Sequence, residues 1–203
     1  MTSLGGTARG DRSQRRIDVL TAATQILDES GWAGLNMREV AARAGVSAGA
    51  TYQWFSGKDE IYAELLTARF VAGTEGLRAT PADMTLEELL FGTFRWVGKT
   101  WNDLGRWQLE FAEISRTRDD VAYVETLGEA HRTLVETGMA QLARLAAAEG
   151  HNLPNDRETA DLIWGAAVGI ATRAAVLEMP AEQLESLQRN AVRVLLTGLL
   201  ETT

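Results

Sequence analysis

The chain has 203 residues, of which 45% are apolar, so it can bury a core and is not expected to be disordered. It contains no cysteine, which excludes disulfides and thiolate-bound metals. The lack of cysteine also fits a reducing compartment, and we expect the protein to be cytoplasmic. The net charge of −8 lies entirely in residues 61–203, with 13 basic and 21 acidic side chains, so it does not exclude DNA as a partner of the charge-balanced first 60 residues.

The first segments in the chain are interpreted as an arm and a helix. Residues 1–12 are polar and glycine-rich and lack the apolar centre of a secretion signal, so we expect a flexible arm. Apolar residues at helical spacing, including Val19, Ala23, Ile26 and Leu27, predict a helix over 13–30. Gly31 closes it, because glycine is the usual residue just after a helix end.

Two short helices are predicted next. Asn36, with Glu39 three residues later, has the spacing of a capping box and predicts the start of the second helix. Gly45 ends that helix, and Ser47 can cap a third helix that runs to about Trp54. Two short helices joined by a tight glycine-containing turn form a helix-turn-helix, whose second helix can enter a major groove.

The remainder of the chain is predicted to be helical as well. Ser56 and Asp59 repeat the capping pattern before a helix over 58–77, and Pro81 follows it. Further helices are expected over 84–101, 105–117, 119–149, 156–179 and 181–201. The fold class is therefore all-α with about nine helices: an arm (1–12), a three-helix helix-turn-helix domain (13–57) and a helical domain (58–203).

The first domain resembles the DNA-binding domain of the TetR family of regulators. The resemblance rests on spaced segments, which are VL at 19–20, AA at 22–23, GW at 31–32, MREVA at 37–41, AGVS at 44–47, YQWF at 52–55 and KDEI at 58–61. It covers about 45 residues with all spacings kept, whereas the rest of the chain resembles the family only in length and helix content. It implies a homodimer that binds a palindromic operator in double-stranded DNA and responds to a small molecule.

The resemblance also implies which residues contact DNA. Arg38 would reach a base edge or a phosphate, and Tyr52 and Lys58 would hold phosphates. Gln53 could pair with adenine N6 and N7. The leading end of the recognition helix would be Ser47, Ala48, Gly49, Ala50 and Thr51. Thr51 stands where the family usually has a larger apolar residue, and the small side chains before it favour readout through DNA shape and thymine methyl contacts.

A ligand pocket is expected in the second domain, among its middle helices. Its candidate residues are mostly aromatic or aliphatic, which favours an apolar or aromatic effector; they are Leu90, Phe94, Trp101, Trp107, Phe111, His131, Val135 and Trp164. The alternative is that these side chains are ordinary core, and a lone histidine on an apolar stripe is more often a core group than a ligand contact.

The last two helices are predicted to form the dimer interface. Residues 162–177 are apolar on nearly every side, which one face packed on its own domain would not require, yet Thr172 and Arg173 interrupt them, so no membrane span is expected. The interface candidates are Ile163, Ala166, Ala167, Ile170, Ala174, Leu187, Ala191, Val194 and Leu195. A two-fold four-helix interface would set the spacing of two operator half-sites.

The function expected from these patterns is that of a DNA-binding repressor released by its ligand. The chain has no glycine-rich phosphate loop and no nucleophile motif, and its two histidines, His131 and His151, form no metal constellation, so we expect no catalysis, no cofactor and no metal. Two alternatives stay open. One is a ligand-binding protein without sequence-specific DNA binding, against which the Tyr52 and Lys58 pair counts, and the other is a DNA-binding activator.

Overall fold

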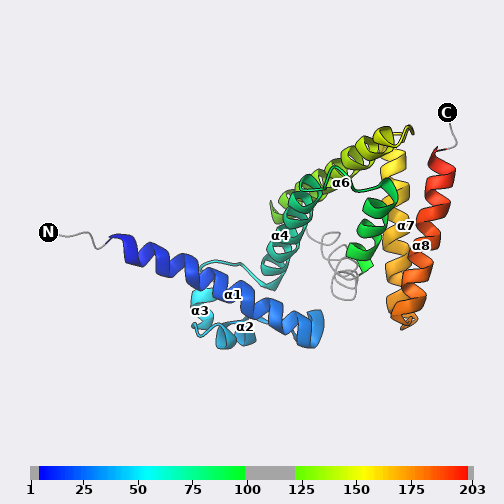
Figure 1. The fold of residues 1–203 in the computed structure, drawn as a ribbon. Helices are drawn as coiled ribbons and strands as arrows, with labels where there is room; N and C mark the ends of the chain where they lie inside the picture. The colour runs from blue at the N-terminus through cyan, green and yellow to red at the C-terminus, as the bar shows by residue number, and fades with distance from the viewer. Residues whose placement is uncertain (1–4, 99–121, 201–203) are drawn as a thin grey trace. The chain divides into compact units, whose positions relative to one another are not determined.

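The computed structural model describes residues 5–98 and 122–200. Side chains are described from residue 13 in the first range and from residue 125 in the second. All regular structure in these ranges is helical, which confirms the all-α prediction (Figure 1). The helices are α1 (Gly5–Gly34), α2 (Met37–Arg43), α3 (Ala48–Thr51), α4 (Lys58–Arg78), a helix over 86–98, α6 (Ala122–Ala148), α7 (Arg157–Val176) and α8 (Ala181–Leu200).

Several helix boundaries differ from the predicted ones. Helix α1 begins at Gly5, so most of the segment interpreted as a flexible arm is helical. Gly31 leaves helical geometry with φ 62° and ψ −167°, as a closing glycine does, and a further turn reaches Gly34. Helix α3 ends at Thr51 and gives way to turns before the predicted end at Trp54. The predicted helix over 105–117 lies outside the described residues.

The chain divides into two compact units. The first comprises Met1–Leu66 with Ala122–Val124, and the second comprises Thr67–Val121 with Glu125–Thr203. The division falls within α4, whereas the sequence placed the domain boundary just before that helix, at 57/58. Because α4 is continuous, its first half belongs to the helix-turn-helix unit and its second half to the helical unit.

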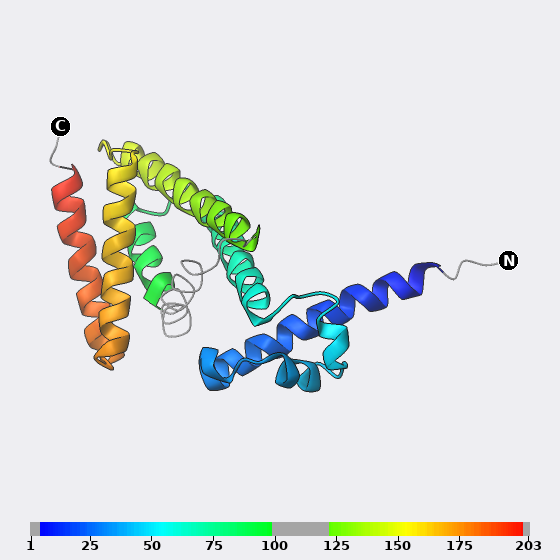
Figure 2. The ribbon, with the colours of Figure 1, turned by 180° about the vertical axis from the view of Figure 1, so that it is seen from behind.

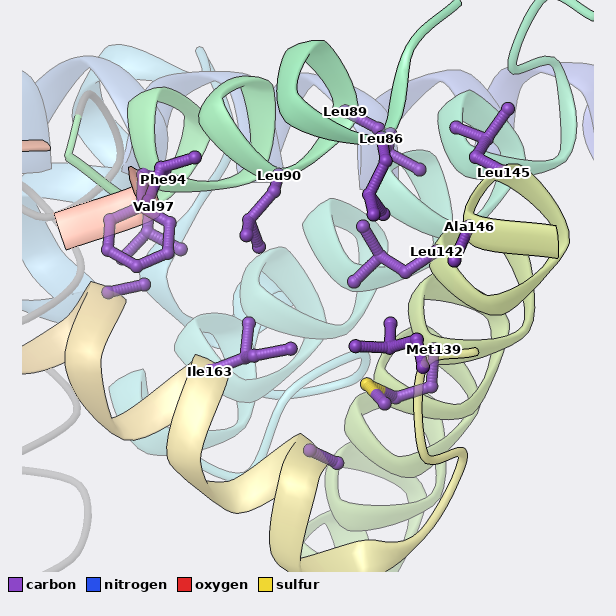
Figure 3. Close-up of a cluster of buried hydrophobic side chains, with 14 of the residues drawn as sticks. Leu86, Leu89, Leu90, Phe94, Val97, Met139, Leu142, Leu145, Ala146 and Ile163 are labelled. Atoms are coloured by element: carbon purple, nitrogen blue, oxygen red, sulfur yellow. The ribbon is translucent and has the colours of Figure 1, made fainter. Parts of the chain in front are cut away.

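The core of the second unit is built around the 86–98 helix. Leu86, Leu90 and Phe94 recur every four residues, are almost fully buried and therefore share one helix face (Figure 3). Buried Gln188 of α8 donates from its side-chain amide to the Phe94 carbonyl at 3.0 Å, which satisfies a polar group inside the core. A Cβ at Gly98 would lie 2.7 Å from that amide nitrogen, so the missing side chain makes room for this hydrogen bond.

Helices α7 and α8 form an antiparallel pair, seen side by side in Figures 1 and 2. The Asp156 carboxylate accepts from the Thr159 backbone N–H at 2.8 Å and caps α7, and this bond lowers the Asp156 pKa from its ordinary value. After α7 the chain turns within four residues, with Glu178 at a positive φ of 47°. The short connection requires the two helices to be neighbours.

Candidate DNA-binding surface and ligand cavity

The helix-turn-helix turn is held by the residues that the sequence indicated. The Asn36 side chain accepts from the Glu39 backbone N–H at 2.9 Å and caps α2. The reciprocal half of the capping box does not form, because the Glu39 carboxylate binds Arg43 one turn later at 3.2 Å. Gly45 takes the left-handed conformation with φ 68°, which lets the chain reverse between α2 and α3.

One residue predicted to contact DNA is instead part of the core. Thr51 is fully buried, and its hydroxyl donates to the Ala48 carbonyl at 2.7 Å, so its side chain cannot reach a groove. The smaller, polar residue at this position packs inward because its hydroxyl finds a backbone partner within α3. The Ser47 side chain caps α3 by accepting from the Ala50 N–H at 3.2 Å.

The other predicted DNA contacts form an exposed surface on the helix-turn-helix unit, which we call the recognition surface. Tyr52 is 57% exposed, an unusual position for a tyrosine ring. Arg38 is exposed and makes no ion pair with the described residues, so its guanidinium is available for a phosphate or a base. The exposed members are Arg38, Ser47, Ala48, Gly49, Tyr52 and Gln53, and Ala50 is half-buried.

Lys58, at the first turn of α4, is positioned by an aromatic side chain from the end of α1. Its ammonium lies 4.2 Å from the centre of the Trp32 ring, with a 3.5 Å contact to the Trp32 carbonyl oxygen. Trp32 in turn meets Tyr62 edge to face at 5.3 Å between ring centres. The cation–π contact restricts the lysine while leaving it half-buried at the edge of the unit.

A second set of contacts joins α1 to α4. Arg16 makes a bidentate pair with Glu64, and its guanidinium also lies 4.9 Å from the centre of the buried Phe55 ring. At the start of α4 the Glu60 carboxylate accepts from the Ser56 N–H at 2.7 Å, the role that the sequence had assigned to Asp59. These contacts fix the beginning of α4 within the helix-turn-helix unit.

The second unit contains a cavity of about 410 Å³, within the range of small-molecule sites. Its lining residues are apolar, glycine or threonine, and none of those described is charged. The hydroxyls of Thr80 and Thr93 already donate to the carbonyls of Leu77 and Leu89, at 2.6 and 3.0 Å. The cavity therefore suits an uncharged, largely apolar group.

The cavity agrees only in part with the predicted pocket. Val135 and Trp164 line it, whereas Leu90 and Phe94 are buried in the core and are not among the lining residues. The 86–98 helix lines the cavity with Leu89, Gly92, Thr93 and Trp96. Trp101, Trp107 and Phe111 lie outside the described residues. The predicted pocket residues do not include the glycine-rich wall, which consists of Gly73 and Gly76 of α4, Gly92, and Gly138 of α6.

His131 lies beside the cavity wall rather than among the lining residues. Its ring is 5.2 Å from Phe70 and 4.9 Å from Trp164, between ring centres, and Trp164 is part of the lining. Burial lowers the pKa of His131 from its ordinary value, because desolvation disfavours the imidazolium. The neutral ring is therefore the form that this aromatic stack holds.

We expect His131 to make the second unit less stable in mild acid. The unfolded chain binds a proton on this residue near pH 6.5, whereas the folded chain does so only at lower pH, so stability falls as the pH drops below about 6.5. Replacing His131 with phenylalanine keeps a ring in the stack and should flatten that part of the profile, as measured by urea unfolding between pH 7.5 and 5.0. The matched control is His151→Gln at the other, exposed histidine; an equal flattening there would contradict the assignment.

The predicted dimer face is partly wrong. Ile163, Ala167 and Ala174 are buried within their own unit, because they lie on the face of α7 that packs on the core. Val194 is 71% exposed. The remaining candidates are half-buried; they are Ala166, Ile170, Leu187, Ala191 and Leu195. The strongly exposed apolar residues Leu162, Val176 and Leu177 lie in the segment predicted to form the interface but were not among its named candidates. An unpartnered apolar face thus runs along α7 and α8.

Residues 19–65 match the family model described as bacterial regulatory proteins, tetR family. The chain is 42% identical over 65 residues to the HTH-type transcriptional activator FasR of Mycolicibacterium smegmatis, and that alignment covers 30% of each protein. No described helix has both the length and the apolar character needed to cross a bilayer.

Solved structures share the fold over nearly the whole chain. A TetR transcription regulator from Haloarcula marismortui matches with a TM-score of 0.71 and 21% identity, covering 93% of this chain and 100% of that one. The transcriptional regulator FadR from Bacillus subtilis, in complex with stearoyl-CoA, matches with a TM-score of 0.67 and 16% identity, covering 90% and 98%. The helical second unit therefore shares the fold of these two solved structures.

Proposed function

The chain belongs to the TetR family of bacterial regulatory proteins, and from that premise we propose that it is a ligand-released repressor that binds a palindromic operator as a homodimer. The observation that carries the proposal is the recognition surface, where Arg38, Tyr52 and Gln53 are exposed beside a capped helix-turn-helix turn. Its partner is bacterial DNA, so the proposed place of action is the cytoplasm. No catalytic role is proposed.

Each exposed side chain has a defined part in this proposal. Tyr52 and Lys58 contact phosphates and set the register of the domain on the duplex, while Gln53 reads a base edge in the major groove. The Ser47-capped end of α3 brings only small side chains, so backbone can approach the DNA closely. Specificity then rests on Gln53, Arg38 and the shape of the operator.

The proposed effector is an apolar small molecule that contains an acyl chain. The cavity wall offers aliphatic and aromatic side chains and no charged group among the described residues, which suits a hydrocarbon chain. The similarity to a FadR in complex with stearoyl-CoA makes a long-chain acyl compound the first to test. The polar head of such a ligand would lie toward the open side of the cavity.

Helix α4 is the proposed route by which ligand binding in the cavity changes DNA binding. Its first turn carries Lys58, and its second half lines the cavity with Ala72, Gly73, Gly76 and Leu77. A ligand that displaces the second half of α4 changes the separation of the two recognition surfaces in the dimer. A coupling free energy of about 1–3 kcal/mol, or 5- to 150-fold in operator affinity, is typical of such linkage.

The proposed dimer uses the unpartnered apolar face of α7 and α8. A second copy would cover Leu162, Val176 and Val194, each of which is more than half exposed in the isolated chain. A two-fold axis between the protomers would present two recognition surfaces to two half-sites of a palindrome.

One observation favours a second candidate function. The relative that shares 42% identity over the DNA-binding region is described as a transcriptional activator. In that case the same surface binds DNA and the ligand promotes transcription. A reporter gene placed behind the selected operator distinguishes the two: repression relieved by ligand supports the repressor, and induction that requires the protein supports the activator.

The experiment that tests the proposal is selection of DNA from a random pool with the purified protein. We expect a palindrome to be enriched, and Gln53→Ala to relax base preference at one position in each half-site, with a loss of about 1–3 kcal/mol in discrimination there. Weak binding without sequence preference would contradict it and would indicate a ligand-binding protein that lacks an operator.

A further inference from the structure

Helix α7 has an exposed face directly opposite the one that packs on its own core. The core face is formed by Ile163, Ala167 and Ala171, whereas the opposite face is exposed. The exposed residues recur every three or four positions, as one helix face requires, and are Glu158, Asp161, Leu162, Gly165, Gly169, Arg173 and Val176. A Cβ at Gly165 or Gly169 would meet nothing within 4 Å, so the middle of this face is open to close approach.

The charges on this face are separated along the helix. Asp161 lies toward the N-terminal end, with an exposed Arg157 at 3.5 Å as its only ion-pair partner among the described residues. Arg173 lies toward the C-terminal end, and no described carboxylate lies within 4.0 Å of its guanidinium. A second copy that covered the face without pairing Arg173 would bury an uncompensated charge, which is strongly unfavourable.

A second copy packed antiparallel about a two-fold axis solves this problem. If the axis passes at the level of Ala167, Gly165 of one protomer opposes Gly169 of the partner subunit, where the two backbones cross closely. Asp161 and Arg173 are each six residues from position 167, or about 9 Å along the helix, so each Arg173 meets the partner's Asp161.

We infer that two symmetric Arg173–Asp161 ion pairs fix the register of α7 against α7 in the dimer. The inference rests on the proposed homodimer and adds the contact that sets its geometry. The neighbouring registers give Arg173 other partners, and the exchange of Asp161 tells them apart. An axis between positions 165 and 166 places Arg173 opposite the partner's Glu158, and that register does not involve Asp161. An axis at Gly165 places Arg173 opposite the partner's Arg157, and an axis at Gly169 places Arg173 opposite the partner's Gly165.

Exchanged charges test this register directly. Arg173→Asp gives each protomer two acidic residues at the paired positions, and Asp161→Arg gives each protomer two basic ones. Each variant alone therefore sets like charges against each other twice, and we expect its dimer dissociation constant to rise about 10- to 100-fold. A mixture of the two variants restores both ion pairs, as does the double variant R173D/D161R.

The readout is sedimentation of each protein, alone and mixed, with differently tagged copies to detect the mixed dimer. A mixed dimer that is tighter than either variant's own dimer supports the inference, and Glu185→Arg on α8, outside the proposed pair, should leave dimerisation unchanged. Wild-type protein that stays monomeric would overturn the proposed dimer itself. Wild-type dimers whose single variants dimerise normally, or a mixture that shows no preference for the mixed dimer, would overturn only the register.

Discussion

Replacing Gly92 with leucine is expected to weaken binding of a long-chain acyl ligand by about 100-fold. Gly92 lines the cavity, and a Cβ built there meets nothing within 4 Å, so the new side chain grows into open space. Its four carbons would displace a similar number of ligand methylene groups, each contributing about 0.8 kcal/mol, or about 3 kcal/mol in total. The fold should tolerate the change, because leucine favours a helix more than glycine does.

Titration with stearoyl-CoA, followed by calorimetry, measures this effect. Gly128→Leu is the matched control: Gly128 is also helical and has open space at its Cβ, but it lies on α6 away from the cavity lining. We expect the control to bind like the wild type. Equal affinities for the two variants would mean that acyl chains bind elsewhere.

Replacing Tyr52 with phenylalanine should lower operator affinity by about 2–3 kcal/mol, on the order of 100-fold. The change removes only the hydroxyl, which we propose donates a hydrogen bond to a phosphate. In the proposed dimer the bond is lost in both half-sites, so the effect is doubled. The ring is 57% exposed, so the stability of the free protein should be unchanged.

Fluorescence anisotropy with the selected operator gives the affinities. Tyr62→Phe deletes the same atom from a buried ring on α4 and keeps the ring that contacts Trp32, so it should leave DNA affinity near the wild-type value. An unchanged operator affinity in Tyr52→Phe, or an equal loss in both variants, would contradict the proposed phosphate contact of the Tyr52 hydroxyl.

The helix-turn-helix could be predicted closely because its determinants are local. The Asn36 cap, the left-handed Gly45 and the Ser47 cap each act within three or four residues, and all three form as the sequence indicated. Thr51 could not be placed by the same reasoning. Its burial depends on how α3 packs within the unit, whereas the resemblance placed it with the DNA contacts only by its position in the recognition helix.

The cavity was less predictable because helices distant in the sequence form its walls. Helical spacing placed Leu90 and Phe94 inside the second unit, but it could not tell which residues of the 86–98 helix would line a cavity and which would pack in the core. The predicted pocket was defined by large side chains and so did not include the lining glycines, whose contribution is the space that they leave open. The same limitation affected α7, where apolar residues on both faces hid the distinction between buried Ile163 and exposed Leu162.

If a ligand in the apolar cavity changes the affinity of the protein for DNA, a titration of the operator with and without ligand reveals it. Operator affinity is measured with and without saturating stearoyl-CoA, for wild-type protein and for Gly92→Leu. We expect a 5- to 150-fold loss of operator affinity with ligand for the wild type and little change for the variant at the same ligand concentration. If calorimetry shows the wild-type cavity to be filled while operator affinity stays the same, the proposed coupling is contradicted.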